Sequence, residues 1–404
     1  MKTIESHMAA DLFFQIRWSS PMGQHTDAYC GHQVNFWRDL LPSPLSKELQ
    51  GKGPGDTVQI KLGAEQLIEA WDRQDLRTIA CRQFDSSPIR KTALLPRSGR
   101  FYPKGRLKDM TGIFAANITP FRCLQTNQSQ LIIDLGHPLC GKEIDLTVTV
   151  GTIRPKLTER GGSLCNWGER ITQGVGMQAR WQDQPTDFFS DNPFERRDEA
   201  PDSLFYARPR MVQHIDDGAM DMVRDIHAQF VNAEMSVLDL MSSWQTHLNE
   251  GIKLKALTGL GLNKTELQRN QMLNSYRLHD LNAQPDLPFN SHSFDTVLCS
   301  MSVEYLVQPL AVFREVARVL KPGGCFVVTF SNRWFESKTI ALWIELHEFE
   351  RMGLVLEYFR HNQLFEDLHS YSFRGLARPA NDKYYGQLPY SDPVYAVWGR
   401  RSSG

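Results

Sequence analysis

The hydrophobic and polar positions follow two different patterns along the chain. From Thr57 to about Ile153, short apolar runs are separated by turn residues, which predicts β-strands. Leu131–Asp134 is one such run. Ile144–Ile153 is another, and its apolar side chains recur at every second position, as in a strand with one buried face.

From about Met211 onward, short apolar runs alternate with helical stretches instead. Pro309–Leu320 has apolar side chains at helical spacing, and Asn263 is a good N-cap with Glu266 three residues later. Strands separated by helices predict a parallel sheet with right-handed crossovers. Past Gly353 the alternation ends, and two final strands are expected to form an antiparallel pair. The predicted strands of this half are residues 236–240, 256–260, 276–278, 294–299, 325–330, 354–361 and 393–399.

Segments rich in Pro, Gly and polar residues separate these regions. Residues 41–56 predict a connector, and residues 156–204 predict a long excursion. We therefore expect four parts, which are an N-terminal extension (1–50), a β-rich α+β domain (51–155), a bridge with a substrate lid (156–230) and an α/β domain (231–404).

Composition narrows the functional class. The 404 residues carry 45 Lys+Arg against 46 Asp+Glu, and 41% are hydrophobic, so the chain has cores to bury but no basic surplus for a nucleic-acid partner. No apolar run approaches the roughly 20 residues that span a bilayer, and residues 1–11 lack the pattern of a secretory signal. The seven cysteines are an odd number without a C-x-x-C pair, so we expect no metal site and a reduced, cytoplasmic setting without a membrane partner.

Four motifs in the C-terminal half resemble those of class I S-adenosylmethionine-dependent methyltransferases of the type 11 kind. They are VLDL (237–240), HDLN (279–282), SFDTVLCSMSVEYL (293–306) and FREVARVLKPGGCFVVTF (313–330). The resemblance covers roughly residues 231–399. It implies a Rossmann-like sheet of seven strands, S-adenosyl-L-methionine as cofactor, and a ligand site outside the carboxyl ends of the strands.

The resemblance also implies roles for individual residues. Asp239 would order the loop around the methionine part of the cofactor, and Asp280 would accept from the adenine amino group. Ser302 belongs to the loop that follows the fourth strand, where the family places the reacting methyl group. The expected cofactor-binding residues are Asp239, Met241, Ser242, Ser243, Gly259, Leu260, Asn263, Asp280, Leu281, Asn282, Ser300 and Met301.

Two positions depart from the family pattern. The loop after the first strand, Met241–Trp244, contains no glycine, so Ser242 and Ser243 would supply donors near the cofactor carboxylate. The acid that usually ends the second strand aligns with Gly261. Asn263 is the nearest replacement by its two-sided amide, and it is equally well explained as the helix cap.

The residues expected to contact the methyl acceptor lie in the segment before the first strand. Residues 205–216 contain a cluster of polar and aromatic side chains, from which Tyr206, Arg210 and His214 are the candidate catalytic residues. The alternative is a capping helix with exposed charge. No side chain stands out as a strong general base, and a thiol needs the least base assistance. A small thiol, hydrosulfide or methanethiol, is therefore the expected acceptor, while hydroxyl, carboxyl and arsenical acceptors stay open.

The N-terminal half resembles the SlyD-like branch of FKBP-type peptidyl-prolyl isomerases. GDTVQI (55–60) is similar to the opening strand of that family, and IIDLGHPLCGKEIDLTVTVGTI (132–153) is similar to its closing segment, with Asp134 and His137 in place. The resemblance leaves two alternatives to a small-molecule methyltransferase. One is an isomerase or chaperone-like binding module that uses the C-terminal fold as a scaffold, and the other is methylation of a protein client docked by the N-terminal domain.

Overall fold

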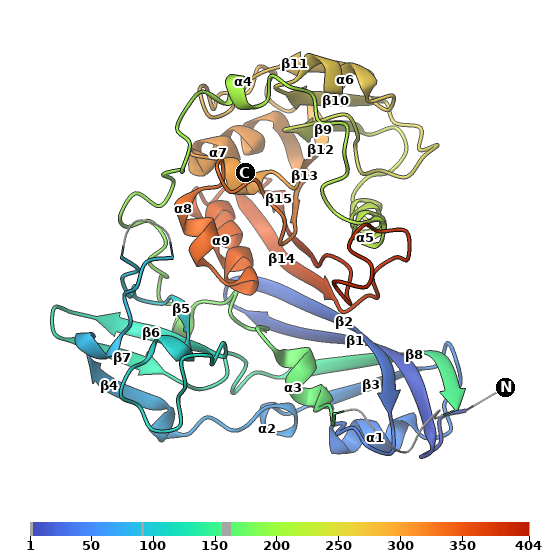
Figure 1. Ribbon diagram of the computed structural model, residues 1–404. Coiled ribbons are helices and arrows are strands. Elements are labelled where there is room, and N and C mark those ends of the chain that lie inside the picture. Colours follow the sequence, from blue (N-terminus) through green and yellow to red (C-terminus); the bar gives the residue numbers. More distant parts are fainter. Residues whose placement is uncertain (1–2, 90–92, 156–162, 404) are drawn as a thin grey trace. The chain divides into compact units, whose positions relative to one another are not determined.

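The computed structural model describes residues 3–89, 93–155 and 163–403, and it divides into two compact units (Figure 1). Unit 1 consists of Met1–Asp191 with Glu345–Gly353, and unit 2 consists of Asn192–Ile344 with Leu354–Gly404. The division therefore falls inside the expected bridge, and the first part of that bridge belongs to unit 1. No helix in the described ranges is long and apolar enough to cross a bilayer.

Unit 2 contains a seven-stranded sheet in the order β11-β10-β9-β12-β13-β15-β14. Its strands are parallel except that β15 runs antiparallel to both β13 and β14. The Rossmann-like sheet expected from the motifs is thus confirmed. Its elements are α4 (Asp202–Phe205), α5 (Asp217–His227), β9 (Ser236–Leu240), β10 (Ala256–Gly261), α6 (Lys264–Arg269), β11 (Ser275–Leu278), β12 (Phe294–Ser300), α7 (Pro309–Val319), β13 (Leu320–Phe330), α8 (Ala341–Glu345), the second part of α9 (Glu348–His361), β14 (Phe365–Arg374) and β15 (Val394–Arg401). The first part of α9, up to Gly353, belongs to unit 1.

The central strands of this sheet form because they are apolar on both faces. Val237, Leu238, Val297 and Leu298 are all fully buried, as expected for parallel strands covered by helices. Figure 1 shows α7 on one side of the sheet and α5 on the other. Both helices are amphipathic, so each buries its apolar stripe and leaves its charged face exposed.

The expected strand at residues 354–361 is wrong, because this segment is the second half of α9. Leu354, Val355, Leu356 and Phe359 are all buried, so the run shows no periodicity that distinguishes a buried strand from a buried helix. The antiparallel partner of β15 is instead β14, whose buried positions alternate along part of its length.

Unit 1 contains two antiparallel sheets. The larger has the order β2-β1-β8-β3, and the smaller, β4-β7-β6-β5, is formed by chain inserted between β3 and β8. The β-rich character of this half is as expected. Its elements are β1 (Met8–Ser20), β2 (Gly23–Asn35), α1 (Ser43–Leu49), β3 (Thr57–Leu62), α2 (Ala64–Leu67), β4 (Leu76–Ala80), β5 (Phe101–Pro103), β6 (Pro120–Thr126), β7 (Gln130–Asp134), β8 (Ile144–Pro155) and α3 (Trp167–Thr172).

Residues 1–50 are not an extension of this unit, contrary to the sequence-based expectation. The hairpin β1–β2 lies inside the larger sheet, where β1 pairs with both β2 and β8. Leu12, Phe14, Ile16 and Trp18 are buried at every second position of β1. This strand pattern is present in the sequence, and its side chains are buried by pairing with β8, more than 120 residues away in the chain.

A buried ion pair stabilises the smaller sheet of unit 1. Arg100 Nε donates to Glu350 Oε1 at 3.0 Å, and the backbone N–H of Phe101, the first residue of β5, donates to the same oxygen at 2.8 Å. Arg100 and Glu350 are 3% and 1% exposed. Burial raises the pKa of Glu350 and Arg100 opposes that shift, so each charge depends on the other.

Candidate active site

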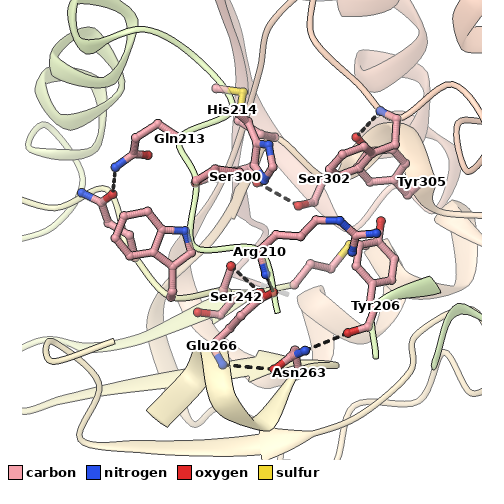
Figure 2. Close-up of a pocket in the computed structure, with 18 of the residues that line it drawn as sticks. Tyr206, Arg210, Gln213, His214, Ser242, Asn263, Glu266, Ser300, Ser302 and Tyr305 are labelled. Atoms are coloured by element: carbon pink, nitrogen blue, oxygen red, sulfur yellow. Dashed lines mark hydrogen bonds between the residues drawn. The ribbon is translucent and has the colours of Figure 1, made fainter. Parts of the chain in front are cut away.

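A cavity of about 480 Å³ opens at the carboxyl ends of β9, β10 and β12 in unit 2 (Figure 2). Parallel strands bring their carboxyl ends to one edge of a sheet, and the loops that follow them meet there. Residues from seven segments line the cavity, at 202–216, 239–247, 260–266, 279–282, 300–305, 333–335 and 382–392.

Asp239 lies on the cavity wall near the end of β9 and is 4% exposed. Its Oδ2 accepts from Ser242 Oγ at 2.5 Å and from Thr246 Oγ1 at 2.7 Å. Among the described residues, both hydrogen bonds to this carboxylate are made to Oδ2, and Oδ1 has no donor. Burial raises the pKa of Asp239 to about 6, although both hydroxyl groups lower it. Within the part of the chain that the structure describes, this carboxylate has no cationic partner.

The loop after β9 contains no glycine, yet one of its residues has a backbone conformation that usually favours glycine. Met241 has a φ of 57°, in the left-handed region where side chains are disfavoured. The N–H of Ser242 donates to the carbonyl of Leu260 at 2.7 Å, and Ser243 Oγ donates to Glu266 Oε2 at 2.6 Å. These contacts hold the loop across the end of β10. Both serines line the cavity, but their hydroxyls donate to Asp239 and Glu266, so neither hydroxyl hydrogen is left to donate to a cofactor carboxylate as the sequence analysis expected.

Asn263 serves as the cap of α6. Its Oδ1 accepts from the N–H groups of Thr265 and Glu266, and its Nδ2 donates to the carbonyls of Tyr206 and Ala207. An amide side chain has two donors and one acceptor oxygen with two lone pairs, so the capacity of Asn263 is used by the protein. The sequence left two interpretations of Asn263, a replacement for the strand-end acid or a helix cap, and the structure shows the helix cap.

The loop after β11 presents a second carboxylate. Asp280 Oδ1 accepts from the N–H groups of Asn282 and Ala283, which leaves Oδ2 for a ligand. Asn282 Nδ2 donates to Asp202 Oδ2 at 2.7 Å and to the carbonyl of Tyr305 at 2.8 Å. Asn282 thus joins the loop after β11 to those that carry Asp202 and Tyr305, and it positions Asp280 on the wall.

The three candidate catalytic residues line the cavity (Figure 2), where His214 and Arg210 contact Phe335 and Tyr206 lies beside Arg210. His214 meets the Phe335 ring edge-on at 5.1 Å. The guanidinium of Arg210 lies 5.3 Å from the Phe335 ring and 5.7 Å from the Tyr206 ring. Desolvation lowers the pKa of His214, so its imidazole is neutral near pH 7.

The loop between β14 and β15 also lines the cavity, through residues 382–384 and Asp392, and the sequence analysis did not identify it. Arg378 Nη1 lies 3.2 Å from Asp216 Oδ2, and its Nη2 donates to Asp392 at 2.9 Å. Asp392 also pairs with Arg333 at 3.0 Å, and Arg333 stacks on Tyr384 at 4.9 Å. Buried acids that converge on one arginine fix this loop in place.

The cavity brings together nearly all of the predicted site residues. The exception is Gly259, which does not line it, because Gly259 lies inside β10 with Leu273 packed at its Cα. Glu266, His247, Trp244 and the 382–384 segment line it without having been singled out as site residues. The predicted residues that line it are Tyr206, Arg210, His214, Asp239, Met241, Ser242, Ser243, Leu260, Asn263, Asp280, Leu281, Asn282, Ser300 and Met301.

Among the described residues, no group of three or more His, Cys, Asp or Glu side chains has the geometry to hold a metal ion. Cys299 at the end of β12 is fully buried, and burial raises its pKa well above the usual range, so it is a protonated thiol in the core.

Comparisons with known proteins agree with this arrangement. Residues 244–328 match a family described as "Methyltransferase domain". Cycloartenol-C-24-methyltransferase 1 of Oryza sativa subsp. japonica is 32% identical over 108 residues, which cover 24% of this chain and 31% of that protein. This chain thus spans about a third of that relative's length.

Two solved structures align with about half of the chain. The S-adenosylmethionine-dependent methyltransferase from Mesorhizobium loti is 17% identical with a TM-score of 0.32, over 46% of this chain and 99% of that one. The YcgJ protein from Bacillus subtilis is 14% identical with a TM-score of 0.31, also over 46% of this chain and 99% of that one.

The residues at the edge of the sheet fit S-adenosyl-L-methionine. Its ammonium group would neutralise Asp239, whose buried carboxylate has one oxygen left to accept, and its adenine amino group would donate to Asp280 Oδ2. The strand order, the motifs and the family match all fall in unit 2. The C-terminal half of the chain therefore contains a class I S-adenosylmethionine-dependent methyltransferase domain, and S-adenosyl-L-methionine is its cofactor.

Proposed function

We propose that the protein transfers a methyl group from S-adenosyl-L-methionine to a small acceptor bound beside Phe335. The observation that carries the proposal is that one cavity joins the Asp239 and Asp280 carboxylates to the cluster of Tyr206, Arg210 and His214. Drug-sized ligands occupy pockets of roughly 300–1,000 Å³. A cavity of about 480 Å³ that also accommodates the cofactor leaves room for a small acceptor only.

His214 is suited to remove the acceptor's proton. S-adenosyl-L-methionine supplies an electrophilic methyl group, so its S–CH₃ bond breaks, an acceptor–CH₃ bond forms, and the acceptor gives up one proton. His214 lies on the cavity wall as a neutral imidazole, which accepts that proton at a ring nitrogen. Tyr206 and Arg210 also line the cavity, and we assign them the task of orienting the acceptor.

A small thiol remains the acceptor that we test first. Thiols are stronger acids than alcohols and react as intrinsically nucleophilic thiolates, so hydrosulfide and methanethiol need little base assistance, and both suit a small cavity. The presence of His214 equally supports a hydroxyl or amine acceptor, for which a base matters more. Incubating the full chain with methyl-labelled cofactor and each acceptor class separates these cases. If the chain binds S-adenosylhomocysteine but methylates none of these acceptors, a small-molecule acceptor of these classes is contradicted.

We expect His214→Gln to reduce kcat about 100-fold for a hydroxyl or amine acceptor, because general base catalysis is worth about that factor or more. A thiolate acceptor should lose less than tenfold. The dissociation constant of S-adenosylhomocysteine should stay unchanged in either case. The matched control is His369→Gln, a histidine that pairs with Asp367 and stacks on Trp398, outside the cavity. An unchanged kcat for every acceptor would remove His214 from the reaction.

A second candidate function is methylation of a protein client, and one feature of unit 1 favours it. Phe114 and Ile118, between β5 and β6, are 76% and 71% exposed, the highest values among the large apolar side chains of the described residues. They lie four residues apart, and a partner that covered both would bury apolar surface. They fall in the stretch that the SlyD-like resemblance aligns with a substrate-binding flap. That resemblance stays a prediction. A proline-isomerisation assay on the full chain tests it, and labelled-methyl transfer to a reduced, unfolded protein tests the client.

A further inference from the structure

The end of β10 has no space for a side chain at residue 261. A Cβ on Gly261 would lie 2.2 Å from the carbonyl oxygen of Ser242, which is closer than real atoms approach. The contact is with backbone, and the hydrogen bond from Ser242 N–H to the Leu260 carbonyl holds that backbone in place. The loop after β9 therefore excludes any acidic side chain from this strand end.

A carboxylate reaches the same region from the next helix. Glu266 lies in the first turn of α6, lines the cavity and is 7% exposed. Its position three residues after the Asn263 cap would allow its side chain to complete a capping box. Instead, its Oε1 accepts from the N–H of Arg210 at 2.7 Å and its Oε2 accepts from Ser243 Oγ at 2.6 Å. The carboxylate is thus fixed on the cavity wall (Figure 2).

Each oxygen of Glu266 retains capacity for one more hydrogen bond. A carboxylate offers about four lone-pair sites, and the contacts with Arg210 and Ser243 use one on each oxygen. Two acceptor sites on neighbouring oxygens match two hydroxyl donors on neighbouring carbons. The neighbouring Asn263 does not compete, because its amide is occupied by α6 and by the Tyr206–Ala207 carbonyls.

We propose that Glu266 binds the 2′- and 3′-hydroxyls of the cofactor ribose. The inference rests on the cofactor assignment. It places the carboxylate that binds the ribose on α6, because the end of β10 has no space for an acidic side chain. Carboxylates recognise ribose hydroxyls in other open α/β folds, and a hydrogen bond to a charged acceptor is stronger than one to a neutral group. Because Arg210 and Ser243 orient the carboxylate before the ligand arrives, little ordering is required on binding.

Calorimetric titration with S-adenosylhomocysteine and its 2′-deoxyribose analogue tests this assignment. The wild-type chain should bind the deoxy analogue about 10- to 100-fold more weakly than S-adenosylhomocysteine. Glu266→Gln should lose about the same factor for S-adenosylhomocysteine and should distinguish the two ligands less than threefold. Glu266→Asp, which keeps the charge but shortens the reach, provides a second variant with the same expected loss. Thr265→Ala, an exposed neighbour in the same turn, should bind like the wild type.

The outcomes separate this inference from the proposed function. A wild-type chain that does not bind S-adenosylhomocysteine would overturn the proposed function. A wild-type chain that binds it, together with a folded Glu266→Gln variant that still discriminates against the deoxy analogue as strongly, would overturn the role of Glu266 alone. Thermal melts of all variants establish that each is folded.

Discussion

Asp239→Asn should weaken the binding of S-adenosylhomocysteine about 100-fold at pH 8. The wild-type carboxylate is buried, and it lacks a cationic partner until the ligand ammonium arrives. A hydrogen bond between charged groups contributes about 1.5–3 kcal/mol, and about 2.7 kcal/mol corresponds to a factor of 100. Asparagine still accepts from Ser242 and Thr246, so the loop after β9 should keep its course. Isothermal titration calorimetry measures the change.

The same substitution should make the ligand-free protein more stable at pH 8. The folded pKa of Asp239 is about 6, above the value of about 3.9 for a free aspartate, so the folded state holds this proton more tightly. Stability therefore falls as the pH rises from about 4 to about 6, and above pH 6 the full penalty of about 3 kcal/mol applies. Asparagine lacks this penalty, and thermal melts at pH 5 and pH 8 should show a gain mainly at pH 8.

Ligand affinity should follow the same titration with the opposite sign. Below pH 6 Asp239 becomes protonated in the free protein, so wild-type affinity should fall up to tenfold per pH unit, while the Asn variant should show little change. The control is Asp295→Asn, which alters an acid paired with Lys321 beside the start of β9. A pH-independent wild-type affinity between pH 5 and 8 would contradict the role of Asp239.

Glu350→Ala should destabilise unit 1 by about 3–5 kcal/mol, because it leaves the guanidinium of Arg100 buried without its counter-charge. It also removes the acceptor of the Phe101 N–H at the start of β5. Hydrogen exchange of peptides from β5 and β6 should accelerate, and the urea midpoint should fall.

Two controls show whether the effect comes from the buried charge. Glu336→Ala breaks an ion pair with Arg197 in which both side chains are about two-thirds exposed, and such pairs contribute about 0–1 kcal/mol. The double variant Arg100→Met with Glu350→Leu removes both charges and should recover much of the loss. If Glu350→Ala is no more destabilising than Glu336→Ala, the pair is not important for stability.

Sequence patterns predicted the parts of the fold that depend on neighbouring residues. The strands β9, β10 and β12 and the helix α7 were predicted nearly to their ends, because apolar runs and helical spacing are local signals. Residues 354–361 were assigned to a strand, because a run buried on every side has no period. The β1–β2 hairpin was missed although its alternation is visible, because composition alone suggested an extension before the connector.

The candidate site likewise contains residues that the sequence motifs identified and residues that only the structure revealed. The motifs located Asp239, Asp280 and the loop after β12, since parallel strands necessarily place their carboxyl ends at one edge. They did not identify Glu266, whose spacing from Asn263 is equally typical of a capping box. They also did not indicate the 382–392 loop, which is brought to the cavity by Arg378 and its aspartate partners.

The sequence by itself therefore predicted the strands and helices of the methyltransferase sheet from local periodicity. The resemblance of its motifs to a known family implied the cofactor and the strand edge at which we expect it to bind. The tertiary structure decided why residue 261 is glycine and where the nearest carboxylate stands. It also decided which segments line the cavity. These features depend on the close approach of backbone at Ser242 and on ion pairs between residues far apart in the chain, which no local pattern records.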